Sequence, residues 1–299
     1  MDIQSFYEPD TGTWTHLLAD PARGAAAIID PVWVYNPVSG QADDGFIEGV
    51  LDIAAARRYR IEWVLETHAH ADHLTAADRV RRRTGARIAC GRGIRQVQQT
   101  FAPVFAMNGM ATDGSQFDRL LVEGDVVELG DLRIEVLETP GHTADSVSYR
   151  VGDAVFVGDT LFAPGFGTAR CDFPGGDAGQ LYDSIARLHA LPDATRLHLC
   201  HDYPKAGDEP VCAVTVAESR RNNVHVHEGT SREDFVAMRR GRDAQLGLPR
   251  LILPSLQVNI LAGAVPAAET NGVSYLRTPF NRPLPELIRA ARQRSGEQK

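Results

Sequence analysis

Short apolar runs and helical stretches alternate along the first third of the chain. The runs at 16–20 (HLLAD), 24–34 (GAAAIIDPVWV) and 61–67 (IEWVLET) have the apolar character of buried strands. Residues 54–60 have helical character, and 76–85 (AADRVRRRTG) predicts a helix that is closed by its terminal glycine.

Hairpin patterns follow in the middle of the chain. Two β-type runs flank the turn Gly130-Asp131, and two more flank Gly152-Asp153. The remaining pattern predicts an irregular insert at 108–116, a short strand at 196–203, and helices at 180–191, 215–223 and 231–247, the last opened by Ser231 as a cap. Antiparallel hairpins with interspersed helices favour an α+β fold of two packed sheets, with helices outside and polar residues at strand ends.

Composition narrows the classes of partner. The 299 residues fit one large domain or two small ones, and 43% hydrophobic with 23% charged residues is typical of a soluble globular protein. A net charge of −8 argues against nucleic acid or an anionic membrane as the main partner. Lysine occurs only at positions 205 and 299, so arginine carries the positive charge, either as a compositional bias or to bind ligand carboxylates.

The chain shows no pattern for export or membrane insertion. Its first ten residues, MDIQSFYEPD, have neither a basic region nor an apolar core. The most apolar late stretch, 251–265, is interrupted by Pro254, Gln257 and Asn259 and is too short to span a bilayer. The four cysteines form no CxxC motif, so we expect reduced thiols and a cytoplasmic protein.

The candidate chemistry begins where the strand at 61–67 ends. Residues 66–77, ETHAHADHLTAA, place His68, His70, Asp72 and His73 within six positions. His68 and His70 face the same side of an extended segment, whereas Asp72 and His73 follow once the chain has turned. One short loop therefore offers two sets of ligands, and the spacing leaves open whether they bind one metal or two.

Three further metal-seeking residues also follow strands. His142 comes after a Pro-Gly turn, Asp159 after a strand and a glycine, and His201 after a short strand. Imidazoles mixed with carboxylates suit zinc, iron or manganese and do not suit calcium. The sequence therefore predicts a transition-metal site at one edge of the sheets.

These seven positions resemble the metallo-β-lactamase superfamily. The matching motifs are THAHADH, TPGHT, GDT and CHDY. The resemblance implies a four-layer αββα sandwich with its metal site at one edge of the two sheets. In two-metal members, one ion takes His68, His70 and His142, the other takes Asp72, His73 and His201, and Asp159 bridges them.

TPGHTADSVSY, GDTLF and GTARCDFPGGD narrow the resemblance to persulfide dioxygenases and their bacterial β-lactamase-like relatives. This resemblance runs over essentially the whole chain. It implies one Fe(II) per chain, held by His68, His142 and Asp159, that oxidises glutathione persulfide or a similar small persulfide with O₂ in sulfide detoxification. Asp72 joins the catalytic residues, and with His70, His73 and His201 it orients ligands and water. The alternative is a thioester hydrolase of the glyoxalase II type with two Zn(II).

Candidate substrate contacts lie beside these motifs. A glutathione carrier needs a cation and a hydroxyl, and we expect these from Arg170, Asp172 and Tyr203, with Arg221 and Arg220 as weaker candidates. An ion pair between Arg170 and Asp172 that only shapes the loop is the alternative. The loop departs from the commoner family version, because Thr168 and Ala169 separate Gly165-Phe166-Gly167 from Arg170. The thiol that carries the persulfide is therefore open, coenzyme A included.

Other cysteines and histidines have structural interpretations. We expect Cys171 and Cys200 to pack in the interior, His189 to be structural, and His225 and His227 to lie at the surface or an interface.

We expect one domain over 1–299, in which the part from about residue 205 onward adds helices and an extended segment to the sandwich. The apolar residues of that part, such as Leu251 and Ile260, either line a dimer interface or cap the sandwich. The resemblance favours a homodimer.

Overall fold

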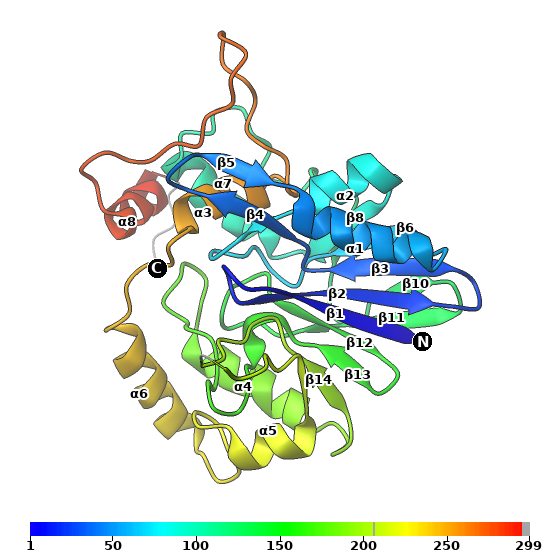
Figure 1. Cartoon of the computed structure of the whole chain (residues 1–299). Coiled ribbons are helices and arrows are strands. Elements are labelled where there is room, and N and C mark those ends of the chain that lie inside the picture. The colour runs from blue at the N-terminus through cyan, green and yellow to red at the C-terminus, as the bar shows by residue number, and fades with distance from the viewer. Residues whose placement is uncertain (206, 295–299) are drawn as a thin grey trace.

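Two six-stranded sheets lie face to face at the centre of the molecule (Figure 1). This is seen in a computed structural model of the whole chain, which describes residues 1–205 and 207–294. Apolar residues of both sheets meet in a common core that includes Leu18, Ile29, Leu65, Val136 and Tyr149. Alternation of side chains along each strand places these residues inward, so the inner faces bury one another.

The first sheet joins antiparallel and parallel pairs. Its order is β1–β2–β3–β6–β8–β9, and the strands span Asp2–Glu8, Thr13–Asp20, Ala25–Ile29, Arg60–Leu65, Arg87–Gly91 and Arg119–Leu121. The pairs β1–β2 and β2–β3 are antiparallel, whereas β3–β6, β6–β8 and β8–β9 are parallel. The prediction of antiparallel hairpins is therefore confirmed for β1–β2–β3 and wrong for the later strands of this sheet, because helices connect those strands and return the chain to the same end.

The second sheet contains the predicted hairpins. Its order is β10–β11–β12–β13–β14–β15, with strands at Val126–Leu129, Leu132–Glu138, Val147–Val151, Ala154–Phe156, Arg196–His198 and Ala213–Thr215. The turns at Gly130 and Gly152 both have positive φ, as tight hairpin turns require. A small third sheet pairs β4 (Val32–Asn36) with β5 (Gln41–Asp43) and β7 (Leu74–Thr75).

Helices cover the outer faces of both sheets and complete the predicted αββα sandwich. On the first sheet these are α1 (Gly45–Ala56), α2 (Ala77–Thr84), α3 (Ile94–Val104), α7 (Ile252–Asn259) and α8 (Leu284–Arg294). On the second sheet they are α4 (Ala178–His189), α5 (Val216–Asn222) and α6 (Arg232–Asp243). As predicted, Ser231 caps α6 by accepting a hydrogen bond from Asp234 N, and Gly85 closes α2 in the left-handed conformation.

Three local predictions are wrong. The first helix covers 45–56, because Arg57 and Arg58 turn the chain into β6 where helix was predicted up to 60. Helix α3 was not predicted; its buried face of Ile94, Val97 and Phe101 packs against the first sheet and α8.

The stretch 251–265 is also not extended throughout, because residues 252–259 form α7. Its apolar residues Leu251, Ile252, Leu256 and Ile260 are buried against the first sheet and its helices, so they cap the sandwich. The contacts of α7 with β7, and of α8 with α3, support our proposal that the chain forms one domain. Within residues 1–205 and 207–294, no helix is both long and apolar enough to cross a bilayer.

A buried pair of histidines makes the fold sensitive to acid. Burial and the neighbouring His198 lower the pKa of His16 to about 3, and burial with Arg196 lowers the pKa of His198 to about 4. Both rings stay neutral in the folded protein, whereas unfolded histidines become charged near pH 6.5. The stability that they contribute is complete above that pH, and it is lost as the pH falls toward the two folded-state values.

We therefore expect the free energy of unfolding to fall by about 1 kcal/mol per pH unit for each ring between about pH 6 and pH 4. Urea unfolding across this range measures the slope. His198→Gln should flatten it, and an unchanged slope in this variant would contradict the assignment.

Candidate metal centre

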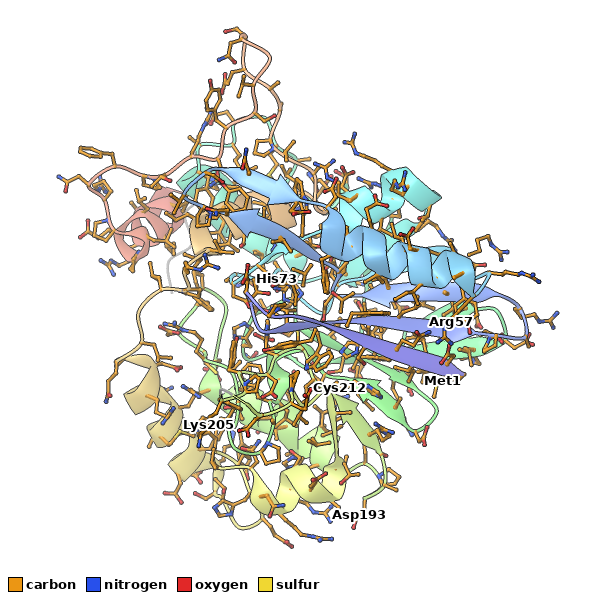
Figure 2. All side chains as sticks on the ribbon, viewed as in Figure 1. Met1, Arg57, His73, Asp193, Lys205 and Cys212 are labelled. Carbon is orange, nitrogen blue, oxygen red and sulfur yellow. The ribbon has the colours of Figure 1, made fainter. Side chains whose placement is uncertain are left out.

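All seven predicted metal-seeking residues lie at one edge of the sandwich, in the loops that follow strands. His68, His70, Asp72 and His73 follow β6, and His142 follows β11. Asp159 lies in the short 3-10 turn after β13, and His201 follows β14. Figure 2 shows His73, which is buried, in the interior of the molecule, whereas Asp193 lies at its lower margin.

One set of donors consists of His68, His142 and Asp159. Asp159 Oδ2 lies 3.8 Å from His68 Nε2 and 3.6 Å from His142 Nε2, and the three donor atoms lie within 4.8 Å of one another. Two imidazoles and one carboxylate in this arrangement match the facial triad of non-haem iron sites.

Hydrogen bonds fix the tautomers of both histidines in this set. His142 Nδ1 donates to the backbone carbonyl of Arg170 over 2.7 Å, which leaves a lone pair on Nε2. The Thr67 hydroxyl donates to Asp30 Oδ2, so its oxygen accepts from His68 Nδ1 at 3.0 Å. Both Nε2 atoms therefore present lone pairs toward Asp159.

A second set adjoins the first. Donor atoms of His70, Asp72, His73 and His201 also lie within 4.8 Å of one another. His201 Nε2 is 3.2 Å from Asp72 Oδ2 and 3.3 Å from Asp159 Oδ1. Asp159 thus points Oδ2 toward His68 and His142 and Oδ1 toward His201.

Unpartnered polar atoms show that these residues fit a metal ion. Buried polar atoms are almost always hydrogen-bonded. Among the described residues, the following buried atoms of the centre have no hydrogen-bond partner: His68 Nε2, His70 Nδ1, Asp72 Oδ2, both ring nitrogens of His73, Asp159 Oδ1 and His201 Nε2. Their convergence in a small volume fits a cation that needs nitrogen and oxygen ligands.

Two residues that support the loop were missed in the sequence. Asp30 accepts hydrogen bonds from Thr67 N at 2.8 Å and from His70 Nε2 at 3.0 Å. Asn259 donates to the carbonyls of His70 and His73 at 2.8 and 2.9 Å. The Asp-Pro pair after an apolar run was a usable signal for Asp30, but nothing in the sequence connects Asn259 to a loop so distant along the chain.

The surroundings of the imidazoles set their protonation, and a neutral imidazole is the form that binds a metal. Burial and the neighbouring imidazoles hold the pKa of His68 and His70 well below the ordinary histidine value, so both are neutral near pH 7. Burial also acts to lower the pKa of His201, but Asp72 and Asp159 outweigh it and raise that pKa. A proton on His201 Nε2 would compete with an ion bound by the second set, so binding at that set would weaken as the pH falls.

The predicted substrate residues fall into two groups. The guanidinium of Arg170 is held by Asp172 at 2.6 and 2.7 Å and by the Gly247 carbonyl at 2.6 Å, over the ring of Phe173. This is the ion pair that the sequence suggested as the alternative. Tyr203 is exposed, and its ring lies nearly parallel to that of His201, with ring centroids 6.0 Å apart.

Arg220 and Arg221 lie on α5, away from these residues. Arg220 binds Asp193 and the His189 carbonyl, and Arg221 is exposed without a described contact to the centre.

The remaining histidines and cysteines that were considered in the sequence make packing contacts or hydrogen bonds, or lie at the surface. Cys171 and Cys200 are buried as predicted, and His189 bonds Ser219. His225 is only partly exposed: its ring lies against Gly167 and accepts a hydrogen bond from Thr168 N. His227 is exposed as predicted.

Known proteins resemble this chain over most of its length. Residues 10–201 match the family described as the metallo-beta-lactamase superfamily. A probable metallo-hydrolase of Burkholderia pseudomallei (strain 1710b) is 48% identical over 292 residues, which cover 94% of this chain and 99% of that protein. Glyoxylase B2 of Dictyostelium discoideum is 39% identical over 282 residues, covering 93% and 97%.

A solved structure shares the fold and the sequence pattern. The crystal structure of ETHE1 from Myxococcus xanthus has a TM-score of 0.71 and 34% sequence identity, over 88% of this chain and 100% of that one.

Proposed function

This chain belongs to the metallo-beta-lactamase superfamily, and from its metal centre we propose that it is an Fe(II)-dependent persulfide dioxygenase. The observation that carries the proposal is the triad of His68, His142 and Asp159, whose donor atoms all lie within 4.8 Å of one another. ETHE1, a persulfide dioxygenase, supports it through its likeness over nearly the whole chain.

The proposed reaction converts glutathione persulfide, O₂ and water into glutathione and sulfite. The S–S bond breaks, the terminal sulfur is oxidised, and O₂ is reduced. Bound at the triad, Fe(II) would supply open positions for the persulfide sulfur and for O₂. The residues of the chain would hold the two reactants side by side and would accept and donate the protons.

The Asp72–His201 pair is placed for proton handling. It lies beside Asp159 Oδ1, the oxygen that does not face His68 and His142, and His201 Nε2 is 3.2 Å from Asp72 Oδ2. We assign this pair to the proton released when the persulfide binds as an anion and to the water that is consumed. His70 and His73 complete the polar wall beside it.

The carrier part of the substrate would lie between Arg170 and Tyr203. Arg170 has five N–H donors, of which three bind Asp172 and Gly247, so two are left for a carboxylate. Partial burial and the nearby Asp72 and Asp159 raise the pKa of Tyr203, so its hydroxyl stays protonated and can donate. We propose no contact for Arg221, because α5 carries it away from the centre.

A second candidate is a dinuclear zinc thioester hydrolase. The donor set of His70, Asp72, His73 and His201 is complete and unpartnered, so it fits a second ion. The names probable metallo-hydrolase and glyoxylase B2 of two relatives also favour hydrolysis. In that case the two ions would be held by the seven metal-seeking residues and would supply an activated water for hydrolysis of the thioester.

Metal analysis and two substrate assays separate the candidates. One iron per chain, with O₂ consumption that depends on glutathione persulfide, supports the dioxygenase. Two metal ions per chain, with cleavage of S-lactoylglutathione and no O₂ uptake, would replace it by the hydrolase. Coenzyme A persulfide tested in parallel identifies the thiol carrier.

His201→Ala tests the number of metal ions in a second way. His201 lies outside the triad, so the variant should keep its iron while turnover falls about 10- to 100-fold, as is typical when a group that orients ligands is removed. Iron content by elemental analysis and O₂ uptake give the two readouts. Loss of iron in this variant would contradict the one-metal assignment.

We propose a cytoplasmic homodimer as the working form. The free cysteines Cys90, Cys171, Cys200 and Cys212 agree with a reducing compartment.

A further inference from the structure

The turn between β1 and β2 docks directly onto the segment that carries His201. Trp14 N donates to the Cys200 carbonyl at 2.7 Å, and Asp202 N donates to the Gly12 carbonyl at 3.0 Å. Tyr7 adds a third bond from its hydroxyl to the Asp202 carbonyl at 2.8 Å. Residues nearly 200 positions apart are therefore held in one rigid unit beside the metal centre.

Within this unit a chain of hydrogen bonds leads from a carboxylate to His201. The Thr11 hydroxyl donates to Glu8 Oε2 over 2.6 Å and lies 2.9 Å from the Thr13 hydroxyl. The Thr13 hydroxyl lies 3.2 Å from His201 Nδ1. Glu8, Thr13 and His201 are all buried, so water does not compete strongly for these bonds.

The carboxylate gives the chain a direction. Both carboxyl oxygens of Glu8 accept backbone N–H bonds, from Asp10 N and Thr11 N, and Oε2 also accepts from the Thr11 hydroxyl. The Thr11 oxygen therefore accepts from Thr13. The Thr13 hydroxyl therefore donates its hydrogen to Thr11, and its oxygen accepts a hydrogen bond from His201 Nδ1. The Gly12 carbonyl lies 3.3 Å from the same Nδ1 atom. A carbonyl can only accept, so this contact also requires a proton on Nδ1.

We propose that Glu8, Thr11 and Thr13 are positioning residues that keep a proton on His201 Nδ1 and direct Nε2 toward Asp72 and Asp159. Nε2 is then the ring nitrogen that faces Asp72 and Asp159 without a proton of its own from this chain of bonds. The effect on turnover rests on the proposed function, whereas the position of the proton is a property of the chain alone.

Thr11→Val is the most informative variant, because Thr11 does not touch His201. Removing its hydroxyl deprives Thr13 of its acceptor, so the Thr13 hydrogen is free to turn toward His201 Nδ1 and compete for that site. Long-range ¹H–¹⁵N NMR of the full-length Zn(II)-loaded protein reads which ring nitrogen carries the proton, and His201→Asn assigns the signal.

We expect a proton on Nδ1 of His201 in the wild type and a partial shift to Nε2 in Thr11→Val. We also expect kcat for persulfide oxidation to fall about tenfold with little change in KM, the lower end of the cost of losing an orienting partner. Thr11→Ser keeps the hydroxyl and should restore both readouts.

Ser5→Ala is the matched control. It removes a hydroxyl bonded to His16 Nδ1 at 2.8 Å on the same strand pair, outside the metal centre. It should leave the His201 signal and kcat unchanged.

A wild-type His201 without a proton on Nδ1 overturns the proposal, even if no variant folds. An unchanged His201 signal in Thr11→Val, or an equal shift in Ser5→Ala, does so as well. If the protein oxidises no persulfide, the proposed function fails, but the NMR measurement still decides the proton position.

Discussion

His142→Ala is expected to leave a folded protein that no longer retains iron and no longer consumes O₂ with persulfide. The residue contributes one of three donors in the triad, and its Nε2 lies 3.6 Å from Asp159 Oδ2. In the wild type its Nδ1 is bonded to the Arg170 carbonyl, so Nε2 is the ring nitrogen available to the metal, and alanine offers no donor in its place. We expect metal affinity to fall about 100-fold or more, beyond the usual cost of losing a residue that only orients a ligand.

Elemental analysis after dialysis, with O₂ uptake on the same sample, measures both effects. His227→Ala is the control, because this histidine is exposed and its ring bonds only the neighbouring Glu228 carbonyl. A His142→Ala protein with full iron content would remove His142 from the triad and with it the proposed function.

Asp30→Asn is expected to weaken metal binding about 10- to 100-fold although Asp30 is not a predicted ligand. Asp30 Oδ2 accepts the Thr67 hydroxyl at 2.9 Å, which makes the Thr67 oxygen an acceptor for His68 Nδ1. Asn places an N–H₂ at that position while its oxygen keeps the bonds from Thr67 N and His70 Nε2. The Thr67 hydroxyl then turns toward His68, and the proton of His68 moves to Nε2, where it blocks the metal.

Chelator competition with Zn(II) measures the affinity, and thermal unfolding measures the accompanying loss of about 1–3 kcal/mol from imperfectly paired buried groups. Asp20→Asn changes another buried aspartate of the first sheet, whose bonds to Ala22 N and Asp131 N serve turns far from the metal. Wild-type affinity in Asp30→Asn, or an equal loss in Asp20→Asn, would show that Asp30 does not set the His68 tautomer.

Particular elements show which parts of the fold could be predicted from the sequence and which could not. The hairpins at Gly130 and Gly152 and the capped helices α2 and α6 were predicted, because their signals lie within a few residues of one another. Helix α3 was missed, because its buried face of Ile94, Val97 and Phe101 is interleaved with glutamines and carries no capping residue. The helical nature of 252–259 was missed, because a continuous apolar run has no clear period.

The same contrast applies to the metal centre. The seven metal-seeking residues were evident from the sequence, since each is a chemically distinctive side chain at the end of a strand. Their separation into two donor sets was not evident, because it depends on how the side chains of Asp159 and His201 are oriented across the edge of the sandwich.

From local pattern and side-chain type, the sequence by itself therefore predicted two packed sheets with helices outside and seven metal-seeking residues with nitrogen and oxygen donors. Only the tertiary structure decided which hydrogen bonds point each imidazole toward the metal. Asp30, Asn259 and the Glu8–Thr11–Thr13 chain reach the centre from remote segments. A hydrogen bond requires two groups to meet within about 3 Å, and for groups so far apart in the chain only folding brings them to that distance.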